Sequence, residues 1–248
     1  MIMDAVELRE FYASKLGLAA SHSIAMALSS IWNPSSDEIF LGLGFPLPWM
    51  DRFSTDAERS VAMMQAGQGA LQWPSPSASA TALVYDDELP LRDASVDRIL
   101  MVHFLEQAES ADECIGEAWR VLSPGGTLVI VIPNRRGVWA RFEHTPFGTG
   151  RPYSRSQLNT LLRNNRFTPE KWSDALHFPP SKRDFVLRTR GGFERLGRRF
   201  WPVFSGVICV TATKRLFQGI PVTARAKRRA VVPVLVPQGT SRSNRDQA

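Results

Sequence analysis

The chain has 248 residues, of which 44% are hydrophobic and 22% charged. This length and composition allow one α/β domain of ordinary size with its own buried core. The two cysteines, Cys114 and Cys209, form no CxxC motif, so a disulfide-stabilised scaffold is excluded and a reducing compartment is expected. The N-terminal residues lack the cationic start of a secretion signal, and no run of eighteen apolar residues occurs. We therefore expect a cytoplasmic protein without a transmembrane segment.

Charge is distributed unevenly along the chain. Residues 1–134 carry 7 Lys and Arg against 18 Asp and Glu, whereas residues 135–248 carry 23 against 6. The two halves can complement each other in the folded protein, which leaves a basic, solvated surface. Alternatively, the basic half can bind a polyanion such as a nucleic acid or an anionic membrane surface.

The N-terminal residues predict two helices. Asp4 and Glu7 form a capping box at the start of a helix over residues 5–16, which carries apolar residues at helical spacing. A second helical stretch ends at Asn33, because a residue that precedes proline is disfavoured in the helical conformation. We therefore predict a helical cap over residues 1–34.

From residue 35 onwards, short apolar runs alternate with helical segments, which indicates a parallel sheet with crossover helices. Strands are predicted near residues 37–41, 59–64, 81–85, 96–102 and 126–132, with a helix over 108–122 before the last of these. The run 127–132 is continuously apolar, as expected for a strand that is covered on both faces.

The remaining elements follow a loop over residues 135–153. Ser154 and Gln157 form a second capping box for a helix that runs to about residue 164. Later elements are predicted at residues 167–176 (strand), 183–200 (basic helix) and 206–213 (strand). We place the main domain at residues 35–217 and predict that the basic, proline-containing tail over 218–248 is disordered.

The strongest local signal lies between Asp87 and Asn134. The sequence "DELPLRDASVD" at residues 87–97 is followed by "EAWRVLSPGG" at residues 117–126. These two elements resemble those of class I S-adenosylmethionine-dependent methyltransferases, more narrowly the type 11 group, with "LPF-D-S-FD" and "E-RVLKPGG" at this spacing. The resemblance covers about residues 37–133. It implies an α/β, Rossmann-like fold with a seven-stranded, mostly parallel sheet, helices on both faces, and an antiparallel last strand.

The resemblance implies that S-adenosyl-L-methionine binds over the loop at Gly42 and Gly44, where a backbone without Cβ allows close approach. An ordinary strand-to-helix turn is the alternative interpretation of these two glycines. The loop departs from the family pattern in two ways. Leu41 or Leu43 stands where the family has an acid, and Pro46, which lacks an N–H, replaces the third glycine.

Four further residues are candidate cofactor ligands by the same resemblance. Gln65 is the one hydrogen-bonding side chain near the position of the ribose-binding acid. Asp86 and Asp87 follow the third strand, where one of them can receive the adenine amino group or both can be solvated loop acids. His103 ends the fourth strand and is expected to line the cofactor pocket; it is also a weak candidate for a general base.

The loop after the fifth strand is where the resembled enzymes often recognise their substrate. Its candidate substrate-binding residues are Arg135, Arg136, Trp139, Arg141 and Tyr153. The arginines can bind an anionic group and the aromatic rings can form a lid or stacking wall. A surface loop with solvated arginines is the alternative.

The sequence therefore predicts a methyltransferase that moves a methyl group to an unidentified acceptor, such as an anionic or aromatic small molecule. Two other functions remain open: a catalytically degenerate protein of the same fold that binds or regulates, and a basic protein that binds nucleic acid or a membrane surface. His22, His144 and His177 lack metal-ligand spacing, so no metal site is expected.

Overall fold

The computed structural model describes residues 3–32, 36–181 and 205–216. The predicted basic helix at 183–200 and the whole predicted tail at 218–248 lie outside the described residues, and so do the basic motifs at 195–202 and 225–229. Among the described residues, no helix is both long and apolar enough to cross a membrane.

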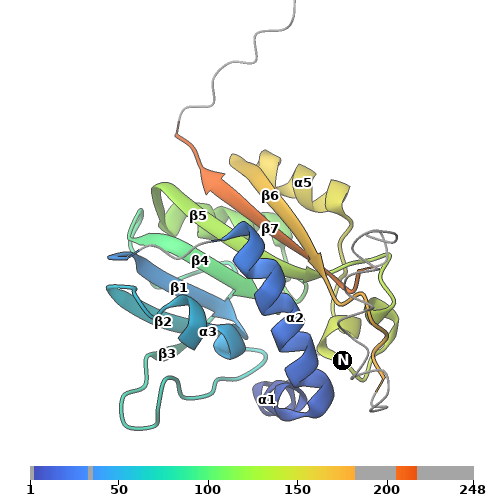
Figure 1. Cartoon of the computed structure of the whole chain (residues 1–248). Helices are drawn as coiled ribbons and strands as arrows, with labels where there is room; N and C mark the ends of the chain where they lie inside the picture. The colour runs from blue at the N-terminus through green and yellow to red at the C-terminus, as the bar shows by residue number, and fades with distance from the viewer. Residues whose placement is uncertain (1–2, 33–35, 182–204, 217–248) are drawn as a thin grey trace, which may run out of the picture. The chain divides into compact units, whose positions relative to one another are not determined.

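The seven described strands form one sheet in the order β3-β2-β1-β4-β5-β7-β6 (Figure 1). The strands are β1 (Ile39–Gly44), β2 (Arg59–Gln65), β3 (Thr81–Val84), β4 (Val96–Val102), β5 (Leu122–Pro133), β6 (Phe167–Ala175) and β7 (Val207–Lys214). Strands β1 to β5 pair in parallel, and β7 is antiparallel to both β5 and β6. The predicted fold class, with its antiparallel last strand, is confirmed.

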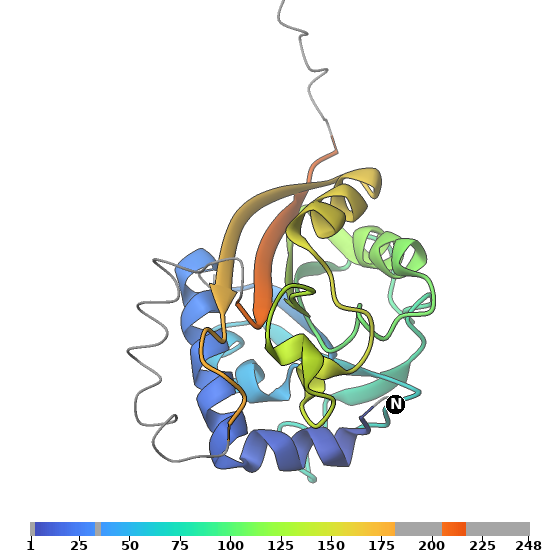
Figure 2. The same ribbon diagram turned by 90° about the vertical axis from the view of Figure 1, so that its right-hand side faces the viewer.

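The helices divide the core into two apolar layers, one on each face of the sheet. The five helices are α1 (Ala5–Ala13), α2 (Lys15–Ile31), α3 (Leu47–Phe53), α4 (Ala111–Val121) and α5 (Arg155–Asn164) among the described residues. Buried residues of α1, α2 and α3 form one layer, and those of α4 and α5 form the other (Figure 2). Both cysteines are free thiols within these layers, and burial raises the pKa of each.

The N-terminal helix predicted over residues 5–16 is divided into two helices at Ser14. This residue is extended, with φ −73° and ψ 159°, and its hydroxyl accepts a hydrogen bond from the Gly17 N–H at 3.1 Å. Gly17 permits the tight corner, because a Cβ there would lie 1.9 Å from the Phe11 carbonyl oxygen. The corner turns α1 across the edge where the parallel strands end, which Figure 2 shows.

Strand β5 begins at Leu122, earlier than the sequence pattern predicted. Residues 123–125, which lie between the helix predicted over 108–122 and the strand predicted near 126–132, are part of the extended segment, because Leu122 already pairs with Val96 and the register then shifts before Arg98. The register shift takes up the irregular chain around the Pro-Gly-Gly sequence while keeping β5 parallel to β4.

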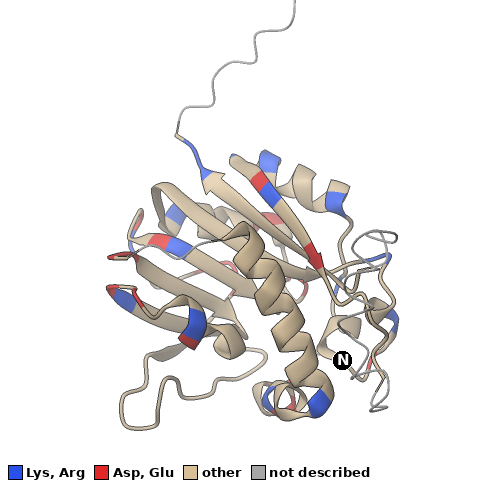
Figure 3. Cartoon of the chain, viewed as in Figure 1, with Lys and Arg blue, Asp and Glu red and all other residues tan. Residues whose placement is uncertain are grey.

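Acidic and basic positions are interspersed over the described strands and helices (Figure 3). Within the acidic half, Arg98 pairs with Glu38 at 2.6 Å, and Arg120 pairs with Glu117 at 2.8 Å. Within the basic half, Arg155 pairs with Asp174, and Arg215 pairs with Glu170. These pairs join partners of the same half, so they do not carry the expected complementarity between the two halves.

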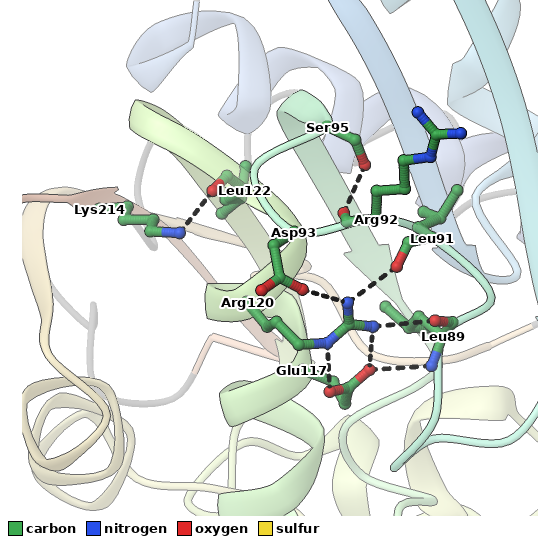
Figure 4. A network of polar contacts seen from close by, with 9 residues as sticks. All are labelled: Leu89, Leu91, Arg92, Asp93, Ser95, Glu117, Arg120, Leu122 and Lys214. Atoms are coloured by element: carbon green, nitrogen blue, oxygen red, sulfur yellow. Dashed lines mark hydrogen bonds and ion pairs between the residues drawn. The ribbon is translucent and has the colours of Figure 1, made fainter.

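The two sequence elements that carried the resemblance meet in one polar network around Arg120 (Figure 4). The guanidinium donates to both Glu117 oxygens and to an Asp93 oxygen, each at 2.8 Å. It also donates to two backbone carbonyls of the loop before β4, at 2.8 and 2.9 Å. Glu117 completes the network by accepting from the Leu89 N–H at 2.9 Å. The motif residues therefore attach α4 to the β3–β4 loop and are structural.

Stability should fall in acid because of Glu117. Hydrogen bonds from Arg120 lower the pKa of Glu117 in the folded protein. A depressed folded pKa contributes stability that is present above the unfolded value, about 4.5, and is lost as pH falls through the folded pKa. We expect Glu117→Gln to be less stable than the wild type at pH 7 and to lose less of its free energy of unfolding between pH 6 and pH 3, measured by urea denaturation. Equal acid losses in the two proteins would contradict this role.

Candidate functional site

The carboxyl edge of the sheet has a reversal of strand order between β1 and β4. Crossovers from β1 lead to β2 and β3 on one side, and the chain then returns to β4 on the other side. The loops after β1 and β4 leave in opposite directions at such a point, so a ligand is expected in the crevice between them.

A cavity of about 710 Å³ lies at this edge, and we call it the edge pocket. Its lining comes from Arg9 and Tyr12 of α1, from Phe45, Leu47 and Pro48 after β1, and from residues 70–72 and 76 after β2. The volume is within the range of small-molecule sites, and the lining is mostly apolar with few polar groups, as such sites usually are.

The two predicted loop glycines are packed tightly against the protein's own chain. A Cβ on Gly44, whose φ is +82°, would lie 2.2 Å from the Val102 carbonyl oxygen. A Cβ on Gly42 would lie 2.5 Å from Pro46 Cγ. The glycines therefore allow β1, β4 and α3 to approach each other, which is a structural requirement separate from the predicted contact with a cofactor.

The end of β2 fits the ribose of a nucleoside cofactor. The Gln65 side chain is 7% exposed, and its Oε1 has no hydrogen-bond partner among the described residues. A buried amide oxygen normally accepts a hydrogen bond, and a ribose hydroxyl would supply the donor. After β3, the Asp86 carboxylate accepts from the Glu109 N–H at 2.8 Å, whereas Asp87 is exposed. Cofactor binding by these three residues stays a prediction.

His103 is buried behind the wall of the edge pocket, at 2% exposure, instead of standing open at its mouth. Its Nε2 lies 2.7 Å from the Tyr12 hydroxyl, and its Nδ1 lies 3.0 Å from Glu106 Oε1. Burial and the charge of Glu106 raise the pKa of Tyr12, so the phenol stays protonated. We therefore assign Tyr12 as the donor to Nε2 and Nδ1–H as the donor to Glu106.

The chain of hydrogen bonds from Tyr12 through His103 to Glu106 was missed by sequence reasoning. Its members come from α1 and from the loop after β4, and Tyr12 and His103 are 91 residues apart. In the sequence, Tyr12 belongs to the apolar residues at helical spacing in α1, so no local pattern indicated that its hydroxyl contacts His103. The arrangement fixes α1 to the end of β4.

The predicted substrate residues are not brought together at the edge pocket. Trp139 is fully buried, and its Nε1 donates to the Phe178 carbonyl at 2.6 Å, so its prediction as a stacking wall is wrong. The Tyr153 backbone pairs with Pro133 and Arg135, and burial raises the pKa of its phenol. Arg135 and Arg141 are exposed.

Arg136 lines a second cavity of about 300 Å³, together with Asn134, Asp174, Ile208 and residues 154–156. This cavity lies where β5 and β6 end, β7 begins and α5 begins, two strands along the sheet from the β1–β4 reversal. Its polar groups include a second arginine, Arg155, but that side chain is already paired with Asp174. Across the described residues, no cluster of three His, Cys, Asp or Glu side chains could hold a metal.

The strand order and the antiparallel β7 are those of the fold of class I S-adenosylmethionine-dependent methyltransferases. A possible histamine N-methyltransferase from Thermotoga maritima has this fold, with TM-score 0.57 and 16% identity over 84% of this chain and 94% of that one. Geranyl diphosphate C-methyltransferase from Streptomyces coelicolor, solved with S-adenosyl-L-homocysteine, aligns with TM-score 0.54 and 16% identity over 78% and 77% of the two chains.

Residues 41–130 match the family model described as "Methyltransferase domain". This segment, less than half of the chain, is therefore similar to the type 11 methyltransferase domain. A curated relative, the ubiquinone/menaquinone biosynthesis C-methyltransferase UbiE of Rubrivivax gelatinosus, is 27% identical over 180 residues. That match covers 69% of this chain and 65% of the relative, slightly less than two thirds of the relative's length.

Proposed function

We propose that the protein is an S-adenosyl-L-methionine-dependent methyltransferase that binds its cofactor in the edge pocket and methylates a small-molecule acceptor. The observation that carries this proposal is the position of the pocket, beside the loops after β1 and β2 at the carboxyl edge of a sheet with the class I methyltransferase strand order. The family match and the orphaned Gln65 oxygen support it.

The protein's part in this reaction is to bind, orient and exclude water. When bound, the cofactor supplies a methyl group that its sulfonium already makes electrophilic, so alignment is the main requirement. Gln65 would accept a ribose hydroxyl, and Asp86 or Asp87 would receive the adenine amino group. The apolar lining, including Phe45, Leu47 and Pro48, would keep water from the reacting groups.

A small-molecule acceptor is supported by the names of two similar proteins. One is named for ubiquinone and menaquinone biosynthesis, and the other for geranyl diphosphate. The second cavity, lined by Arg136, supports an acceptor that carries an anionic group. These observations do not distinguish a carbon acceptor from oxygen or nitrogen.

Calorimetric titration of the full chain with S-adenosylmethionine and S-adenosylhomocysteine tests the proposal. We expect saturable binding with one site per chain. Ligand at 100 times its Kd should add about 2.7 kcal/mol to the free energy of unfolding, which raises the Tm by roughly 5–10 °C. Absence of both heat and a thermal shift at millimolar ligand would exclude cofactor binding and with it the enzyme.

A binding or regulatory protein with the same fold is the second candidate function. The missing loop acid, the amide at the ribose position and the lack of an N–H at Pro46 favour it. Retention of the fold without affinity for either ligand is the result that would support this candidate.

A further inference from the structure

The loop after β1 offers few hydrogen-bond donors to an anionic ligand. The Phe45 N–H already donates to the Val102 carbonyl at 2.7 Å, and Pro46 has no N–H. Helix α3, which follows, has seven residues and no side-chain cap. An amino-acid carboxylate at this loop therefore needs a partner from another element.

Arg9 is the one charged side chain in the described lining of the edge pocket. It lies three residues before Tyr12, so the two side chains are neighbours on one face of α1. Arg9 is exposed and forms no ion pair with a described residue. Nearby Glu7 is engaged in the capping box, where its carboxylate accepts from the Asp4 N–H at 3.0 Å. The guanidinium is therefore available to a ligand in the pocket.

The position of Arg9 is fixed by contacts at both ends of α1. At the start, the Asp4 carboxylate caps the helix, and the Ala5 N–H donates to the Gln68 carbonyl at 2.8 Å. At the end, Tyr12 is held by His103 at 2.7 Å. These contacts hold α1 against the loops after β2 and β4, so the helix presents Arg9 to the pocket without reorganisation.

We propose that Arg9 binds the α-carboxylate of the cofactor and replaces the donors that the loop after β1 has lost. A guanidinium matches a carboxylate with two parallel hydrogen bonds, which adds both affinity and selectivity. The pocket would then prefer nucleosides that carry an amino-acid group over those that lack it. This inference rests on the proposed function, because it assumes that the edge pocket holds the cofactor.

Carboxylate binding by Arg9 can be distinguished from a general effect of Arg9 on the shape of the pocket by comparing the affinities for two nucleosides, one with the carboxylate and one without it. S-adenosylhomocysteine carries the carboxylate, and 5′-deoxy-5′-methylthioadenosine does not. We expect Arg9→Ala to weaken binding of the first about 10–30-fold in calorimetric titration, and of the second less than about 3-fold. Arg9→Lys should give an intermediate loss, because lysine retains the charge but not the paired geometry.

Arg59→Ala is the matched control. Arg59 is exposed at the start of β2, at the opposite edge of the sheet, and lies 3.6 Å from a Glu58 oxygen. Its replacement should leave both affinities unchanged, and thermal unfolding of each variant verifies that the fold is retained.

Three other results of these titrations would contradict either the inference about Arg9 or the proposed function. Wild-type affinity of Arg9→Ala for S-adenosylhomocysteine overturns the inference but leaves the proposed function standing. Equal losses for both nucleosides also overturn it, because Arg9 would then shape the pocket without reading the carboxylate. If the wild type binds neither nucleoside, the proposed function fails first.

Discussion

Replacing Gly44 with alanine is expected to lower the free energy of unfolding by about 3–5 kcal/mol. Two costs add at this position. The φ of +82° is unfavourable for a residue with a Cβ, and the new atom would lie 2.2 Å from the Val102 carbonyl oxygen and 2.9 Å from Phe104 Cβ. Both neighbours are buried, so neither can move away easily. Urea denaturation of the two proteins at pH 7 measures the difference.

Gly67→Ala is the matched control for this experiment. Gly67 lies in the loop after β2, has no positive φ, and a Cβ there would meet no atom within 4 Å. We expect its stability to stay within about 1 kcal/mol of the wild type. If Gly44→Ala has the same free energy of unfolding as this control, Gly44 is not packed tightly between β1 and β4. Because of the same clash, a substitution of Gly44 by a large residue would change the stability of the fold as well as any affinity for the cofactor.

Arg120→Ala is expected to destabilise the protein by about 3 kcal/mol. The substitution removes five hydrogen bonds, three of them to carboxylates and two to backbone carbonyls. It also leaves Glu117, whose side chain is 17% exposed, without its cation. The Arg120 side chain is 32% exposed, so water will replace part of what is lost, and the figure is reduced for this reason.

Arg163→Ala provides the comparison, because Arg163 occupies the last turn of α5 as Arg120 occupies the last turn of α4. Among the described residues, the Arg163 side chain donates one hydrogen bond, of 3.4 Å, to Asn159 Oδ1 on its own helix. We expect a change within about 0.5 kcal/mol. Similar losses for the two variants in thermal and urea unfolding would mean that the network around Arg120 contributes no more than an ordinary helix-terminal cation.

Much of the fold could be predicted from the sequence, because apolar periodicity and capping residues act locally. The capping boxes at Asp4 and Ser154 are present as predicted, and the continuous apolar run after Gly126 lies in a strand covered on both faces. The break at Ser14 was missed because the apolar spacing continues across it. What divides the helix is the Ser14 hydroxyl and the absence of a Cβ on Gly17.

The candidate site was less predictable, since it depends on contacts between distant segments. Gln65 could be found because it stands at the end of a strand that the sequence pattern indicates. Arg9 and Tyr12 could not, because their place in the pocket depends on how α1 crosses the sheet edge. Trp139 shows the opposite error: an aromatic residue in an arginine-rich loop suggested a binding wall, but the ring completes the core through Phe147 and Phe178.

The segment that matches the family model, residues 41–130, is smaller than the unit that forms the edge pocket. It contains β4 and most of β1, the strands on both sides of the order reversal, but one wall of the edge pocket comes from Arg9 and Tyr12, which lie 32 and 29 positions upstream of residue 41. An expression boundary drawn at the family match would therefore yield an open crevice with a buried histidine deprived of its phenol partner. For this chain, the segment that matches the family model and the segment that forms the edge pocket have different boundaries, and the difference is the first helix.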